Sequence, residues 1–94
     1  MYARLATFQG DPANVDDTIS RVRGDLEGDP PPGLEDAKVL MLVNRETGKG
    51  VAVVLFESEE AMRRGDEALN AMNPGGGGQR QSVEFYEVPV HNLG

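Results

Sequence analysis

The middle of the chain carries two segments that are apolar at every position, residues 39–43 (VLMLV) and 51–56 (VAVVLF). A strand with one wet face alternates apolar and polar residues, whereas a strand buried on both faces is apolar throughout. The turn-rich segment between them, residues 44–50 (NRETGKG), contains Gly48, which can adopt the positive φ of a tight turn. The pattern therefore predicts a β-hairpin that is covered on both faces.

Two further segments have helical periodicity. Residues 14–27 carry apolar side chains at intervals of four, three and four, with Asn14 as the expected N-cap. Residues 58–72 form a second predicted helix with Ser58 as its N-cap. Gly65 lies on the inner stripe of this helix, where the absence of a side chain permits close approach to a sheet.

The remaining segments are predicted as two strands and two connections. Residues 2–8 and 82–90 are the strands, and Pro89 marks the second as an edge strand or a strand end. The proline-rich residues 29–36 form a stiff connection, and the glycine run at 75–78 forms a flexible linker. A phosphate-binding glycine loop lies between a strand and a helix N-terminus, and here the order is reversed.

The predicted order is strand, helix, strand, strand, helix, strand. With right-handed crossovers this is a ferredoxin-like α+β sandwich, a four-stranded antiparallel sheet with both helices on one face. The 94 residues make a single domain, 1–94. Two helices cover only one face of the central hairpin, so the other face needs cover from outside the chain, and a second copy is the simplest candidate.

A chain this short has only marginal stability without disulfides, a bound metal or oligomerisation, and the composition excludes or disfavours the first two. There is no cysteine and one histidine, which excludes disulfides and disfavours a histidine-built metal site, and no cofactor has a signature. Oligomerisation remains. The net charge of −7 argues against nucleic acid and anionic membranes as partners. With no secretory signal or membrane-length apolar run in the sequence, we expect a cytoplasmic protein.

Several turn and cap segments resemble those of the dimeric α+β barrel superfamily, which includes the antibiotic biosynthesis monooxygenases. They are Pro32-Gly33-Leu34 before the second strand, residues 46–50 in the hairpin, residues 56–61 at the start of the second helix, and residues 85–88 in the last strand. The resemblance spans nearly the whole chain. It implies a homodimer in which two sheets face each other, and a small apolar or aromatic ligand.

The residues that carry catalysis in this superfamily are mostly missing. Haem-degrading members have an asparagine on the first strand, where this chain has Thr7, together with a tryptophan and a histidine near the second helix. The chain has no tryptophan, and Phe56 stands where many relatives carry one. Haem degradation is therefore disfavoured, and the quinone-forming oxygenases, which also use asparagine and tryptophan, are disfavoured too.

Arg4 is the first candidate site residue. A guanidinium on a central strand could orient a carboxylate or polarise an enolate oxygen of a bound molecule. The alternative is a structural ion pair with Glu84 or Glu87 on the neighbouring last strand.

Four further residues are weaker candidates. Tyr2 and Tyr86 could donate hydrogen bonds to a ligand or pack at an interface. Asn44 could bind a polar ligand group or close the hairpin turn. His91 could act as a general base, with Tyr86 as the other proton carrier, or lie in a solvated tail.

Three hypotheses follow. The first is a small enzyme resembling the cofactor-independent monooxygenases, acting on an apolar or enolisable molecule. The second is a non-catalytic homodimer that binds a ligand or serves as an interaction module. In the third, the open sheet face pairs with a different protein.

Overall fold

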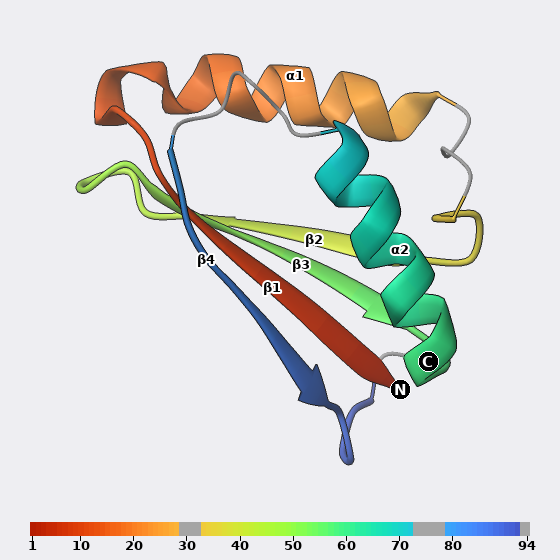
Figure 1. The fold of residues 1–94 in the computed structure, drawn as a ribbon. Helices are drawn as coiled ribbons and strands as arrows, with labels where there is room; N and C mark the ends of the chain where they lie inside the picture. Colours follow the sequence, from red (N-terminus) through yellow and green to blue (C-terminus); the bar gives the residue numbers. More distant parts are fainter. Residues whose placement is uncertain (29–32, 73–78, 93–94) are drawn as a thin grey trace.

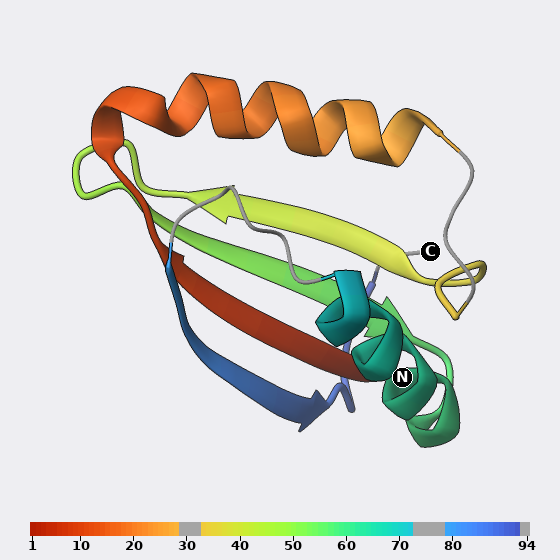
Figure 2. The same ribbon diagram turned by 45° about the horizontal axis from the view of Figure 1, so that its top comes forward.

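The computed structural model describes residues 1–28, 33–72 and 79–92. The strands form one antiparallel sheet in the order β2-β3-β1-β4, and both helices lie on the same face of it (Figures 1 and 2). The elements are β1 (Tyr2–Gln9), a 3-10 turn (Pro12–Asn14), α1 (Val15–Glu27), β2 (Lys38–Val43), β3 (Lys49–Phe56), α2 (Glu59–Met72) and β4 (Gln79–Glu87). The predicted ferredoxin-like βαββαβ arrangement is confirmed. The expectations for residues 29–32 and for the glycine run 75–78 lie outside the described residues.

The last strand is shifted towards the N-terminus relative to its prediction. Residues 82–90 were expected, whereas β4 spans Gln79–Glu87 and pairs with the full length of β1. Val88 still donates a backbone hydrogen bond to Met1 at 2.8 Å, but Pro89 has no N–H with which to continue the ladder. The strand is an edge strand, as the proline indicated.

The helix starts differ in how their backbone amides are satisfied. Ser58 caps α2, since its Oγ accepts a hydrogen bond from the Ala61 amide at 3.1 Å. Asn14 occupies the N-cap position of α1 but makes no side-chain cap bond. Asp11 caps the 3-10 turn Pro12–Asn14 instead, and its side chain accepts a hydrogen bond from the Ala13 amide at 2.9 Å. The helical segment therefore begins with this turn, before α1.

The core lies between the sheet and α2. Val54 and Phe56 of β3 and Met62 of α2 are buried there. A Cβ atom added to Gly65 would overlap the ring of Phe56, so the glycine lets α2 pack directly on this ring. The predicted close approach at Gly65 is confirmed.

The opposite face of the sheet is apolar and only partly covered. Leu40 and Leu42 on β2 and Tyr86 on β4 are 48%, 54% and 47% exposed. We call this the open face, and its residues are Lys38, Leu40 and Leu42 on β2, Val51, Val53 and Leu55 on β3, Ala3, Leu5 and Thr7 on β1, and Ser82, Glu84 and Tyr86 on β4. The chain after β4 turns back on this side of the sheet, near the end where Ala3 and Leu55 are buried (Figures 1 and 2).

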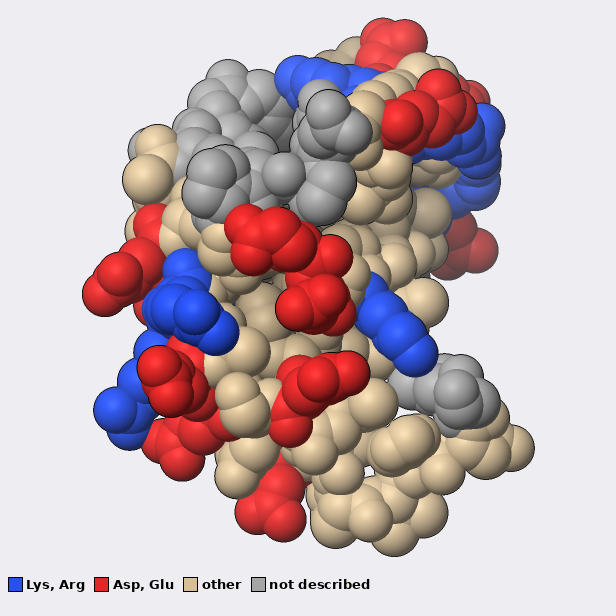
Figure 3. Space-filling view, turned by 90° about the vertical axis from the view of Figure 1, so that its right-hand side faces the viewer, with Lys and Arg blue, Asp and Glu red and all other residues tan. Residues whose placement is uncertain are grey.

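Helix α1 is less deeply packed than α2. Val15 at its start is buried and Ile19 and Val22 are half-buried, whereas Leu26 at the end of the same stripe is 56% exposed. Acidic side chains are spread over one face of the molecule with basic ones among them (Figure 3). Within the described residues, neither helix is long and apolar enough to cross a bilayer.

Candidate functional site

Arg4 connects the middle of the sheet to helix α2. It lies in β1 between Val54 of β3 and Phe85 of β4, and it is only 4% exposed. Its Nε donates a hydrogen bond to Asp66 Oδ1 at 2.8 Å, and its Nη2 donates to Asn70 Oδ1 at 3.3 Å. Asp66 and Asn70 are four residues apart, so they stand one above the other on the same side of α2.

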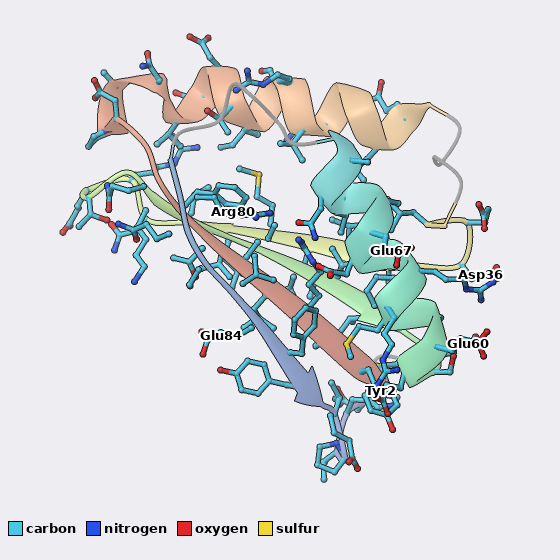
Figure 4. All side chains as sticks on the ribbon, viewed as in Figure 1. Tyr2, Asp36, Glu60, Glu67, Arg80 and Glu84 are labelled. Carbon is cyan, nitrogen blue, oxygen red and sulfur yellow. The ribbon has the colours of Figure 1, made fainter. Side chains whose placement is uncertain are left out.

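Arg80 reaches the same helix from β4. Its Nη1 donates to Asn70 Oδ1 at 2.8 Å, the same atom that accepts from Arg4. The register explains how it does so: Thr7 pairs with Ser82 but Phe8 pairs with Arg80, so Gln81 is an extra residue in β4. Such a bulge reverses the alternation of side chains. Figure 4 accordingly shows Arg80 on the helix side of the sheet and Glu84 on the other side.

We call Arg4, Asp66, Asn70 and Arg80 the Arg4 cluster. Two guanidinium groups face one carboxylate in it, which leaves one net positive charge in a chain whose net charge is −7. The expected ion pair between Arg4 and Glu84 or Glu87 is wrong. Glu84 is paired with Leu5 and so faces the opposite side of the sheet from Arg4, while Glu87 is paired with Tyr2 at the end of the strand.

The two tyrosines lie on opposite faces of the sheet. Tyr2 is on the helix side, half-buried against the core of Val54, Phe56 and Met62. Tyr86 is on the open face, and its hydroxyl donates to Glu84 Oε2 at 2.9 Å. This hydrogen bond and the negative charge of Glu84 raise the pKa of Tyr86 above its usual value. Tyr86 is therefore a neutral donor at neutral pH rather than a base.

Asn44 and His91 lie away from the Arg4 cluster. Asn44 closes the hairpin, where its Oδ1 accepts from the amides of Glu46 at 2.9 Å and Thr47 at 3.2 Å. From the register, it is about 20 Å along the sheet from Tyr2. His91 is exposed beyond the end of β4. The predicted site residues therefore do not converge on one point, although Arg4 and Tyr2 share the helix side.

A shallow cavity of about 150 Å³ lies elsewhere, where the segment before β2 meets the start of α2. It is lined by residues that include Glu35, Asp36, Ser58 and Arg64, and Arg4 is not among them. Drug-sized ligands usually occupy pockets of about 300 Å³ or more. Among the described residues, no group of three or more His, Cys, Asp or Glu side chains is arranged to hold a metal ion.

Sequence reasoning did not identify Asp66, Asn70 or Arg80 as partners of Arg4. A signal for the first two was present, since their spacing of four beside the inner stripe places both next to the sheet. Arg80 was missed because the last strand was predicted to begin at residue 82, and the bulge that orients Arg80 has no clear sequence signature.

Comparison with solved structures supports the fold at low sequence similarity. A protein from Chloroflexus aurantiacus, provisionally named an antibiotic biosynthesis monooxygenase, matches with a TM-score of 0.59 and 12% identity, covering 99% of this chain and 98% of the other. A second, from Deinococcus radiodurans and with the same provisional name, matches with a TM-score of 0.53 and 12% identity over 100% of both chains. No family model and no curated protein matches the sequence.

These matches define the class of fold. The chain has, over its full length, the α+β fold of proteins provisionally named antibiotic biosynthesis monooxygenases, as its turn and cap segments indicated. At 12% identity the likeness establishes the fold and not the activity.

Proposed function

We propose that the protein is a homodimer joined through the open face of its sheet, and that each chain binds a small apolar molecule between its sheet and its helices. The observation that carries the proposal is the apolar open face. Leu40, Leu42 and Tyr86 are each about half exposed there, beside the half-buried Val51 and Val53. Contiguous apolar surface of this kind is typical of an interface.

The second half of the proposal is supported by the position of Arg4. A guanidinium that is 4% exposed lies between the sheet and α2, and within the described residues its hydrogen bonds all go to α2. Tyr2 lies on the same side of the sheet. A charged donor between apolar strands can orient an oxygen atom of a bound molecule.

A monooxygenase reaction is what the names of the two similar structures suggest for this ligand, and the resemblance of the sequence to the barrel superfamily suggests that it would need no cofactor. In such a reaction Arg4 would stabilise an enolate or phenolate oxygen of the substrate. The proton carrier on the helix side would have to be a group other than Tyr86, because this side chain faces away from Arg4 and its pKa is raised.

A non-catalytic dimer is the second candidate. It is favoured by the ion pair between Arg4 and Asp66 at 2.8 Å, which gives Arg4 a structural role without any ligand. It is also favoured by the separation of Tyr2, Tyr86 and Asn44 over two faces and two ends of the sheet.

Native mass spectrometry of freshly purified protein tests both halves of the proposal. The expected result is a species of twice the 10.1 kDa chain mass, with additional mass from a co-purified small molecule. A dimer without bound mass, and without oxygen uptake when offered aromatic substrates, would favour the non-catalytic candidate. A monomer without ligand at micromolar concentration would contradict the proposal.

A further inference from the structure

The hydrogen-bonding capacity of the Arg4 cluster is only partly used. Arg4 has five N–H groups, of which Nε and one hydrogen of Nη2 are bonded to described residues. Its Nη1 group donates to no described residue, although the side chain is only 4% exposed. Among the described residues no buried side-chain nitrogen or oxygen atom lacks a partner, so Nη1 reaches solvent, and a bound ligand can replace water as its acceptor.

Asn70 adds further donors at the same place. Arg4 and Arg80 bond to the same side-chain atom of Asn70. Because arginine can only donate hydrogen bonds, this atom must be the amide oxygen. The NH2 group of Asn70 is then directed elsewhere, and it has no acceptor among the described residues. The cluster thus presents free N–H groups from Arg4, Asn70 and Arg80, and its one carboxylate already binds Arg4.

The net charge of the Arg4 cluster also favours binding of an anion. Two guanidinium groups and one carboxylate leave one positive charge uncompensated. Arg80 and Asn70 are exposed while Arg4 is buried, so the cluster opens to solvent at one end and closes at the other. A single anionic group entering from the open end would bring acceptors to the free donors and neutralise the charge.

Aromatic residues flank both guanidinium groups. Phe85 pairs with Arg4 across β1 and β4, and Phe8 pairs with Arg80 across the same two strands. Phe85 is 49% exposed and Phe8 is half-buried, and Val83 lies between Arg80 and Phe85 along β4. The surface beside the cluster is therefore apolar, which suits a ligand with an apolar body behind its anionic group.

We propose that the Arg4 cluster binds the carboxylate of a small apolar acid, with the carboxylate between Arg4 and Arg80 and its apolar body against Phe85 and Val83. The inference rests on the proposed function in treating the ligand as a small molecule. It assigns the chemical class of this molecule and adds Arg80 and Asn70 as binding residues.

The test compares two probes of the same shape, 2-naphthoate and the neutral alcohol 2-naphthalenemethanol, by calorimetric titration of the full chain. We expect the carboxylate to bind at least about tenfold more tightly than the alcohol, the effect of one charge-assisted contact. Arg80→Gln should remove this preference, because the exposed Arg80 supplies one of the two positive charges.

Arg63→Gln is the matched control. It removes the same charge from an arginine on α2 that pairs with Glu59 at 2.7 Å outside the cluster, so the preference for the carboxylate should persist. Thermal melts of both variants show whether the fold is retained, and neither exposed arginine contributes to the core.

Three results would overturn the inference. If both probes bind equally well, the protein binds apolar molecules as proposed but the Arg4 cluster is not an anion site. If Arg80→Gln keeps the preference for the carboxylate, the anion binds at another place. If neither probe binds at millimolar concentration, the inference fails together with the ligand-binding half of the proposed function, and the dimer is judged separately by its mass.

Discussion

At the scale of single residues, Gly65 shows how one missing side chain positions α2. An added Cβ would overlap the ring of Phe56, which is itself buried in the core. The sequence alone indicated a glycine on the inner stripe of this helix. Glycine lowers the stability of a helix, so its presence there needs a compensating gain in packing. The structure supplies the packing reason.

Gly65→Ala should therefore lower the free energy of unfolding by about 1–2 kcal/mol, because overpacking outweighs the gain in helix propensity. Gly24→Ala in α1 is the matched control, since a Cβ there meets no atom within 4 Å. It should raise the free energy of unfolding by about 0.5–1 kcal/mol. Urea denaturation of both variants measures the difference, and equal effects of the two substitutions would refute the packing argument.

Tyr86 provides a prediction about pH. Its hydrogen bond to Glu84 and the charge of Glu84 raise its pKa, so the folded protein favours the neutral phenol. The resulting stabilisation is complete below the pKa of the unfolded chain, about 10, and is lost as the pH rises through the higher folded pKa. Glu84→Ala should bring the pKa of Tyr86 down towards its ordinary value.

Absorbance titration at high pH in a Tyr2→Phe background measures this pKa without interference from the second tyrosine. Glu87→Ala serves as the control, because the Tyr86 hydroxyl bonds to Glu84 and not to Glu87, which belongs to the other face of β4. A Tyr86 pKa that is unaffected by Glu84→Ala would show that the Tyr86–Glu84 bond does not persist in solution.

At the scale of elements, the ion pair between Arg4 and Asp66 ties β1 to α2. Arg4 is buried and Asp66 is 26% exposed, so removing the carboxylate leaves a guanidinium without its counter-charge inside the protein. We expect Asp66→Ala to lower the free energy of unfolding by about 2–3 kcal/mol, less than for a fully buried pair because Asp66 reaches solvent.

Asp16→Ala is the comparison for this prediction. Asp16 also binds an arginine, Arg45, at 2.9 Å, but the two side chains are 83% and 62% exposed. Its loss should cost at most about 1 kcal/mol, through an exposed pair and the helix dipole. Thermal or urea unfolding of both variants measures the two losses in the free energy of unfolding. Similar losses would mean that other groups balance the charge of Arg4 when Asp66 is removed.

Prediction of the elements from sequence succeeded where local chemistry determines them. The apolar hairpin, the Ser58 cap and the positive φ of Gly48, 79°, follow from residues close together in the chain. The start of β4 and the direction of Arg80 were not predicted, since both depend on pairing with β1, which lies 70 or more residues away in the chain. The partner of Arg4 was predicted wrongly because Asp66 is 62 residues away in the chain and reaches Arg4 only through the packing of α2 on the sheet.

At the scale of the whole molecule, the open face predicts self-association. Leu42→Glu places a charge on this face, at a side chain that is 54% exposed in the single chain. Burying an unpaired carboxylate in an apolar interface is costly, so the variant should dimerise at least about tenfold more weakly. Analytical ultracentrifugation over a concentration series measures this effect.

Leu26→Glu is the matched control, because Leu26 is 56% exposed but belongs to α1 on the other side of the sheet. It adds the same charge to the same chain and should leave the dimer intact. Equal loss of self-association in both variants would indicate a general charge effect, and loss only in Leu26→Glu would place the interface on the helix side.

The sequence by itself determined the order of elements, the ferredoxin-like class and the apolar character of both faces of the central hairpin, because these follow from periodicity and turn residues. It also singled out Arg4. Only the tertiary structure decided what Arg4 touches, since the Arg4 cluster brings together residues 4, 66, 70 and 80 through strand register and helix packing. A local pattern cannot encode a one-residue bulge opposite a distant strand, and that bulge brings the second arginine to the cluster.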